Sequence, residues 1–174
     1  ELTLSAEKVS DIVTLKYEKL TNKLETAYRS DKAAIVFHNE FAEYITAQLT
    51  MATAHRETLE YGFTTYTIDL ARGLILVFDK YSFENQPYRV LVLPKLIVDQ
   101  LFHYKTHLKN LAHVFKHQKS ELSKSLLLVA SDKVSNLPFL FKIKGEEIVH
   151  VGKNDLDHFF ENLYLPSNFN RHFI

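Results

Sequence analysis

Three basic residues on separate predicted elements carry the clearest chemistry in this sequence. Arg56 closes the helix-like run in "MATAHRETLEYG", Lys80 ends the strand-like "GLILVFDK", and Arg171 lies in "LPSNFNRHFI". If they converge, they suit one phosphate, because two planar guanidiniums bind its non-bridging oxygens and the lysine supplies a proton. Taken alone, Arg56 is explained more simply by an ion pair with Glu57 or Glu60.

The first of these residues is positioned by a predicted pair of N-terminal helices. Apolar residues at a spacing of three to four predict a helix over residues 5–28 with Ser5 as its N-cap. A second helix is expected over residues 32–54, capped by Asp31. Its buried stripe is predicted at Ala34, Phe37, Phe41, Tyr44, Ile45 and Leu49.

The hydrophobic period then changes to that of strands. The runs "TTYTIDL", "GLILVFDK" and "YRVLVLP" predict three short antiparallel strands. Pro94 is expected to open a third helix, because proline suits a first helical turn. The apolar face of that helix is predicted at Ile97, Leu101, Tyr104, Leu108, Leu111 and Phe115.

The C-terminal third is predicted as a solvated stretch, a hairpin and two helices. "KHQKSELSKS" is polar and is expected to lie in solvent. A hairpin is expected around Gly145, followed by a short helix capped by Asn154. A last helix begins with Ser167 or Asn168 as its cap. The fold class is therefore α+β, a mainly helical domain with a small three-stranded antiparallel sheet.

Composition limits the functional classes. The 174 residues suffice for one domain with a core, and 46% of them are hydrophobic. Lys+Arg and Asp+Glu both number 21, which argues against a strongly basic nucleic-acid binder but not against a local basic surface. The absence of cysteine excludes disulfides and thiolate metal sites. No apolar run predicts a membrane span and no signal peptide is recognisable, so a cytosolic protein is expected.

Two other groups of residues have the spacing of a site, and a structural role is favoured for both. His103 and His107 are spaced i,i+4, as are His113 and His117, a spacing that can place two imidazoles on one metal. They lack the glutamate of a His-Glu-x-x-His motif, and histidines on a polar helix face are the favoured interpretation. The acidic residues form the other group, and they suit a hairpin turn and a first helical turn. They are Glu146, Glu147, Asp155 and Asp157.

Over roughly residues 30–174, the sequence resembles the catalytic domain of the tyrosine recombinases, the phage-integrase family. "ATAHRETLEYGFTTYTIDLARGLILVFDK" resembles the family's first arginine, its sheet and its catalytic lysine. "RVLVLPKLIVDQLFHYKTHLKNL" is similar to the strand, proline and long helix that follow. "LPSNFNRHFI" resembles the start of the His-x-x-Arg-His helix. Residues 1–30 would form an N-terminal helix leading into this domain, and residues 31–174 a partial catalytic domain.

The resemblance implies catalytic roles for residues in these motifs. Arg56 and Arg171 would stabilise charge on a DNA phosphate, and Lys80 would protonate the leaving 5′-oxygen. Asn168 stands where the family has histidine, so it can hydrogen-bond a phosphate oxygen but cannot act as a base at neutral pH. His172 follows the second arginine.

Other positions depart from the family pattern. Ala54 replaces the usual glycine before Arg56, and the expected acidic residue is displaced from position 59 to Glu60. The family's Gly-His motif and nucleophilic tyrosine follow the second arginine, whereas all tyrosines here precede Arg171. The sequence is therefore interpreted as a fragment that lacks strand-cleaving activity.

The resemblance implies a function for the parent protein. It would be a site-specific DNA recombinase or integrase that forms a covalent 3′-phosphotyrosyl intermediate and needs no metal or other cofactor. It implies double-stranded DNA as the partner, with self-association on DNA left open, and a cytoplasmic, nucleoid-associated location in a prokaryote or phage. A possible DNA-contact face on the third helix consists of His103, Lys105, His107 and Lys109.

Two alternatives remain open. One is a non-catalytic DNA-binding or protein-interaction domain on a recombinase-like scaffold. The other is an unrelated α/β domain in which the three basic residues do not converge.

Overall fold

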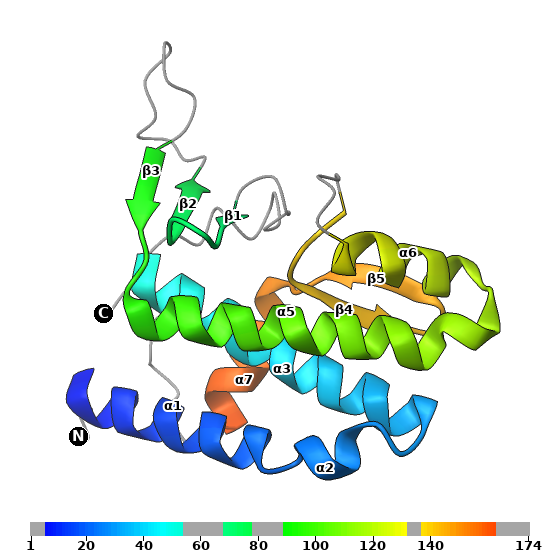
Figure 1. Cartoon of the computed structure of the whole chain (residues 1–174). Coiled ribbons are helices and arrows are strands. Elements are labelled where there is room, and N and C mark those ends of the chain that lie inside the picture. Colours follow the sequence, from blue (N-terminus) through cyan, green and yellow to red (C-terminus); the bar gives the residue numbers. More distant parts are fainter. Residues whose placement is uncertain (1–5, 54–67, 78–88, 132–136, 163–174) are drawn as a thin grey trace.

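The N-terminal part of the chain is built on one long buried helix with two shorter helices packed alongside it. The computed structural model describes residues 6–53, 68–77, 89–131 and 137–162. The N-terminal helices are α1 (Ala6–Thr21), α2 (Leu24–Ala27) and α3 (Asp31–Thr53). In Figure 1, α1 and α2 follow one another along one side of the molecule, and α3 runs back behind them in the opposite direction.

The prediction of one helix over residues 5–28 is wrong, because the helix is interrupted at Asn22 and Lys23. Thr21 and Asn22 are both poor helix formers, which makes this a favourable place for the break. Leu24, one of the apolar residues whose spacing predicted the single helix, is 43% exposed after the break. The proposed cap Ser5 lies outside the described residues.

The second predicted helix is confirmed as α3, and all six residues of its predicted stripe are buried. Its cap is Ser30, not Asp31, because Ser30 Oγ accepts a hydrogen bond from the backbone N–H of Ala33 at 3.1 Å. Asp31 is the first helical residue, where its negative charge suits the positive end of the helix dipole.

The three predicted strands are confirmed as a small antiparallel sheet in the order β1-β2-β3. The strands are β1 (Ile68–Asp69), β2 (Leu74–Val77) and β3 (Arg89–Val92). Ile75 is fully buried, whereas Val90 and Val92 on β3 are exposed. Figure 1 shows that this sheet stands over the end of the molecule where α3 finishes and the next helix begins.

That next helix is α5 (Lys95–Phe115), and Pro94 is its N-cap, one position before the first helical turn in which it was expected. Its six predicted apolar residues are all buried. The polar stretch at 116–125 is mostly exposed, as predicted, but it is helical, and Leu122 and Ser123 within it are buried. A 3-10 turn, η1 (Lys116–Gln118), is followed by α6 (Glu121–Ala130), whose cap Ser120 accepts a hydrogen bond from Ser123 N–H at 3.1 Å.

The predicted hairpin is confirmed as β4 (Phe141–Lys144) and β5 (Glu147–His150), and it leads into α7 (Lys153–Asn162). Gly145 has φ +63°, a left-handed conformation that favours glycine. Asn154 is not the cap of α7, because the helix starts before it. Instead, Asp155 Oδ2 accepts a hydrogen bond from the N–H of Gly152, at the N-cap position, at 2.9 Å.

The elements pack around α3, which contacts α5, β4 and α7. The described part of the chain is thus mainly helical with small antiparallel sheets, and the predicted α+β class is confirmed. No helix among the described residues is long and apolar enough to cross a membrane.

Candidate functional site

The residues of the predicted phosphate site lie outside the described parts of the chain. These are Arg56, Lys80, Asn168, Arg171 and His172. Their convergence on one phosphate therefore stays a prediction.

Two of the elements that precede these residues are described. Arg56 follows the last residue of α3 by three positions, and Lys80 follows the last residue of β2 by three. In Figure 1, α3 ends beneath the sheet that contains β2.

A chain of hydrogen bonds through two buried histidines joins four parts of the fold. The Tyr28 hydroxyl lies 2.7 Å from His107 Nδ1, and His107 Nε2 lies 2.9 Å from His38 Nδ1. His38 Nε2 in turn lies 2.8 Å from the carbonyl oxygen of Phe141. This histidine relay thus connects the end of α2 to α5, α3 and β4.

The last acceptor fixes the direction of the whole relay. The Phe141 carbonyl can only accept, so His38 Nε2 carries a proton and neutral His38 Nδ1 accepts from His107 Nε2. Neutral His107 then accepts at Nδ1 from the Tyr28 hydroxyl. Every polar atom of the two rings therefore has a partner while both rings are neutral.

Burial keeps both imidazoles uncharged. It lowers the pKa of His38 to about 4, although the hydrogen bond to Phe141 opposes the shift. Burial, together with the neighbouring His38, lowers the pKa of His107 to about 2. Because His107 is only 2% exposed, its place in the predicted DNA-contact face is wrong.

The metal interpretation of the histidine pairs finds no support in the described residues. His107 is held in the histidine relay, and His103 Nδ1 lies 2.6 Å from the hydroxyl of Tyr17. Among these residues, no group of three or more His, Cys, Asp or Glu side chains is arranged to hold a metal ion. His103 and His107 instead tie α5 to the N-terminal helices through Tyr17 and Tyr28.

Glu146 lies in the hairpin turn and Asp155 in the first turn of α7, as expected, whereas Glu147 is already part of β5 and Asp157 lies beyond that first turn. Lys142 Nζ lies 3.1 Å from Asp155 Oδ1 and 2.6 Å from Glu43 Oε1. Burial would raise the pKa of Asp155, but the Gly152 N–H and the Lys142 ammonium outweigh it and lower the pKa. Burial would lower the pKa of Lys142, but the two carboxylates raise it. This ion-pair cluster joins β4 to α3 and α7.

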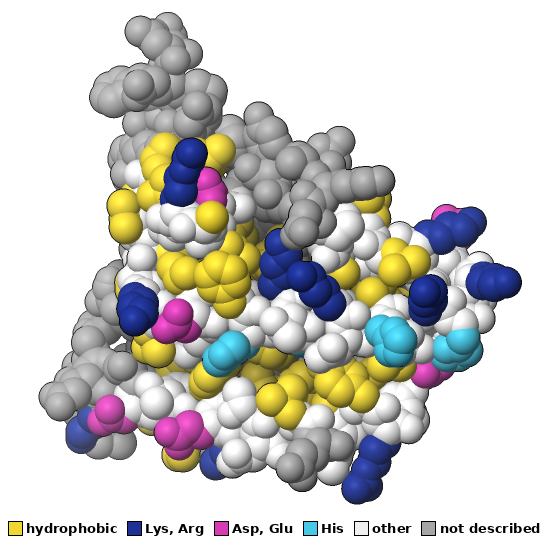
Figure 2. Space-filling view, in the orientation of Figure 1, with side chains coloured by type: hydrophobic (Ala, Val, Ile, Leu, Met, Phe, Trp, Pro, Cys, Tyr) yellow, Lys and Arg dark blue, Asp and Glu magenta, His cyan; other side chains and the backbone are white. Residues whose placement is uncertain are grey.

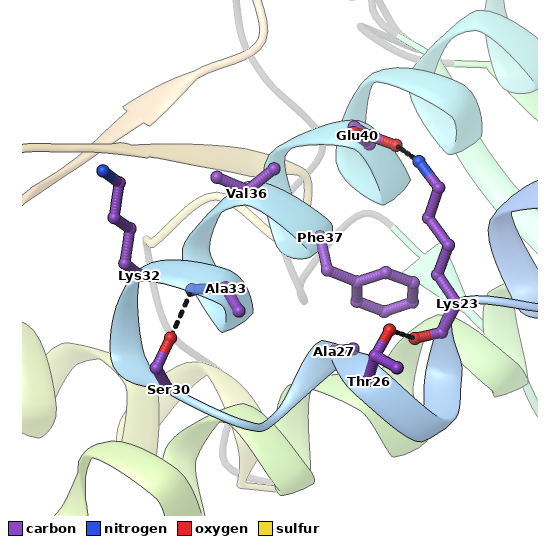
Figure 3. A pocket seen from close by; sticks show the side chains of 9 residues that line it. All are labelled: Lys23, Thr26, Ala27, Ser30, Lys32, Ala33, Val36, Phe37 and Glu40. Atoms are coloured by element: carbon purple, nitrogen blue, oxygen red, sulfur yellow. Dashed lines mark hydrogen bonds and ion pairs between the residues drawn. The ribbon is translucent and has the colours of Figure 1, made fainter.

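A pocket of about 380 Å³ lies between α2 and α3. Figure 3 shows Phe37 projecting into it, with the ion pair of Lys23 and Glu40 on one side at 3.1 Å. The hydroxyls of Thr26 and Ser30 already hydrogen-bond to backbone groups. Its lining offers no converging acid, base and nucleophile.

A basic stripe runs along the exposed face of α5 and η1. From Leu101 to Ser120 the sequence contains no Asp or Glu. Basic residues recur there at spacings that place them on one helix face, over a length of about 18 Å. We define the α5 basic stripe as Lys105, Lys109, His113, Lys116 and His117.

Most of this stripe faces solvent. Lys109, His113, Lys116 and His117 are exposed, and Lys105 is half-buried. Figure 2 shows dark-blue and cyan side chains along the course of α5 and at the corner where it leads into α6. On α3, Asp31 Oδ2 lies 4.0 Å from His117 Nε2.

Sequence reasoning found part of this stripe and missed the rest. Lys105 and Lys109 were predicted to contact DNA, but the stripe continues through His113 and Lys116 into η1. The i,i+4 spacing of His113 and His117 is one that can place two imidazoles on one metal, and it did not by itself indicate a basic surface. The absence of acidic residues over residues 101–120 would have identified the face.

Comparison with known proteins does not place the chain in a family, because no family model, curated protein or solved structure matches it.

Proposed function

We propose that this chain is a DNA-binding domain on a recombinase-like scaffold, and that it binds backbone phosphates through the α5 basic stripe. The observation that carries the proposal is a helix face with regularly spaced lysines and histidines and no carboxylate of its own. Lysine contacts to phosphates release condensed counterions and supply sequence-independent affinity. They also fix the orientation of a protein on the duplex.

The overall charge of the chain is compatible with such a local surface. The formal net charge is zero, so DNA must be attracted by a local excess of positive charge on one face and not by the charge of the whole chain. Acidic side chains on other elements are partly neutralised by nearby lysines, as Glu43 and Asp155 are by Lys142. In the α5 basic stripe, Lys109 and Lys116 form no such ion pair with another described residue, and residues 101–120 contain no Asp or Glu.

The proposal is tested with the double variant Lys109→Ala/Lys116→Ala. Binding of the 174-residue chain to a labelled 30-bp duplex is measured as a function of salt, starting at low ionic strength. If both lysines contact phosphates, the slope of log K against log[salt] becomes shallower by about 1.8, or about 0.9 for each contact. The matched control is Lys153→Ala, an exposed lysine at the start of α7.

Either of two results would count against the proposal. One is the absence of salt-dependent binding by the wild-type chain at low ionic strength. The other is an unchanged slope in the double variant, or the same loss in Lys153→Ala.

We further propose that the parent protein is a site-specific recombinase, for which the order of the elements gives separate support. A long helix, a three-stranded antiparallel sheet and a proline-initiated helix follow one another as the resemblance implies. In this proposal, Arg56 and Arg171 stabilise the charge that develops on the phosphate, and Lys80 protonates the leaving oxygen.

Covalent trapping on a nicked suicide DNA substrate tests the catalytic proposal in the parent protein. Arg56→Ala and Arg171→Ala should each abolish the trapped protein–DNA adduct while leaving salt-dependent binding through α5 intact. Trapping at the wild-type level would reject the assignment. Binding without any trapping in the wild-type parent would favour the non-catalytic DNA-binding alternative.

A further inference from the structure

The histidines of α5 and η1 fall into two structural kinds. The Nδ1 atoms of His103 and His107 each form a hydrogen bond with the hydroxyl of a tyrosine of the N-terminal segment, at 2.6 and 2.7 Å. His113 and His117 are exposed and lie one helical turn apart within the α5 basic stripe. The second pair lies among lysines. Each proton that an imidazole there binds adds positive charge to a surface that is already positive.

We propose that His113 and His117 make DNA binding by this chain pH-dependent, so that the α5 basic stripe binds backbone phosphates more tightly when both imidazoles are protonated. This inference rests on the proposed DNA-binding function and adds a mode of regulation to the same surface. Histidine is suited to the role because its charge ordinarily changes between pH 5 and 8.

The charged neighbours of the pair determine how much each histidine contributes. On their own segment the neighbours are lysines, which are Lys109, Lys116 and Lys119. On α6, Glu121 and Lys124 pair with one another at 3.2 Å. On α3, Asp31 lies 4.0 Å from His117 Nε2 and also accepts a hydrogen bond from Gln118. Protonated His117 therefore shares its charge with Asp31, and His113 is expected to contribute more.

The other histidines of the segment are kept out of this effect by their contacts. His107 lies in the histidine relay, where burial and His38 hold its pKa at about 2. The ring of His103 stacks against Tyr17, with ring centroids 6.4 Å apart, and lies outside the basic stripe. The pH dependence should consequently be removed by substituting two residues only.

The test compares DNA binding at pH 6.0 and pH 8.0 at constant ionic strength, with a duplex that carries a pH-insensitive dye. For the wild-type chain, the slope of log K against log[salt] should be steeper at pH 6.0 by up to about 1.8, or about 0.9 for each imidazole that contacts a phosphate. His113→Gln/His117→Gln should bind at pH 8.0 within about twofold of wild type and lose the difference between the two pH values. In the single variants, His113→Gln should lose the larger share.

His158→Gln on α7 is the matched control, since His158 is exposed but belongs to another face, and it should keep the full pH dependence. Equal slopes at both pH values in the wild type, or a full pH response in the double variant, would overturn the inference and leave DNA binding standing. Failure of the wild-type chain to bind at either pH would instead remove the proposed function together with this inference.

Discussion

At the scale of single residues, the two buried histidines are the most unusual feature of the described structure. His38 is completely buried and His107 is 2% exposed, yet each ring nitrogen has a hydrogen-bond partner. Buried polar groups are tolerated when they are satisfied in this way. The relay links side chains of α3 and α5 to Tyr28 and to the carbonyl of Phe141, so its role is to hold four parts of the chain together.

The stability of the protein should therefore depend on pH. Both histidines have lowered pKa values in the folded state, so the unfolded chain takes up protons first as the pH falls below about 6.5. Above that pH, the two histidines are neutral in both the folded and the unfolded chain, so the free energy of unfolding does not depend on their titration. Below that pH, the free energy of unfolding should fall by up to about 2.7 kcal/mol per pH unit, until His38 titrates near pH 4.

Urea unfolding at pH values between 7 and 4.5 measures this slope. His107→Gln removes one of the two depressed groups and should reduce the slope by roughly half. His158→Gln, which replaces an exposed histidine, should leave it unchanged. A wild-type free energy of unfolding that is constant over this range would show that the relay is not neutral as described.

Tyr28 is the donor at the outer end of the relay. Tyr28→Phe leaves the buried Nδ1 of His107 without a donor, which should cost about 1–3 kcal/mol of stability. Tyr17→Phe is the matched control, because water can replace its hydroxyl at the exposed His103 and the cost should stay below about 1 kcal/mol. Equal losses in the two variants, measured by urea unfolding, would contradict this account of the relay.

At the scale of the elements, side chains of α3 form hydrogen bonds with the outer edge of β4, the first strand of the β4–β5 hairpin. The Asn39 amide donates to the carbonyl of Ile143 at 3.1 Å and accepts from its N–H at 2.8 Å, so one side chain takes the place of a neighbouring strand. On the same edge, His38 Nε2 donates a hydrogen bond to the carbonyl of Phe141 at 2.8 Å. Edge strands are commonly protected from pairing with other chains, and here helix side chains provide the protection.

Hydrogen exchange at Ile143 tests this arrangement. Asn39→Ala removes both hydrogen bonds and should destabilise the fold by about 1–3 kcal/mol while speeding exchange of the Ile143 amide. Asn39→Asp is the informative comparison, since it can still accept from the Ile143 N–H but cannot donate to the carbonyl. Exchange in Asn39→Asp should be intermediate, and exchange at wild-type rates in Asn39→Ala would contradict the role of this residue.

The helices and strands were the most predictable level of this structure. The stripes of α3 and α5 were predictable because their apolar residues keep one period over several turns. The caps were less so, because Ser30 and Asp31 both suit a helix start and only the hydrogen bond to Ala33 distinguishes them. The helix α6 was missed because its polar first turn hides the apolar spacing that follows it.

The side-chain networks could not be predicted from the sequence. His38 and Phe141 are 103 residues apart, and a histidine beside a buried stripe gives no sign that it will be buried. The same holds for Lys142 and Glu43, which are 99 residues apart. Such pairs depend on how the elements pack, whereas the basic stripe of α5 depends on one segment only.

At the scale of the whole molecule, the described structure separates a tightly connected interior from a charged outer face. The relay, the Asn39 contacts and the ion-pair cluster of Lys142 fix the hairpin, α3 and α5 to one another. The α5 basic stripe lies on the other side of α5 from the buried residues that face α3. A helix held in this way is a rigid support for phosphate contacts, and we expect DNA to bind to this face.

Lysine footprinting tests most directly whether DNA covers the α5 basic stripe, because it measures how far DNA protects each lysine from acetylation. The chain is acetylated with and without a 30-bp duplex at low ionic strength, and the modification of each lysine is read by mass spectrometry. DNA should reduce the acetylation of Lys109 and Lys116 several-fold and leave Lys32 on α3 and Lys153 on α7 unchanged. Protection of Lys32 or Lys153 with no change at Lys109 and Lys116, or no protection anywhere, would contradict the central claim that the α5 basic stripe binds DNA.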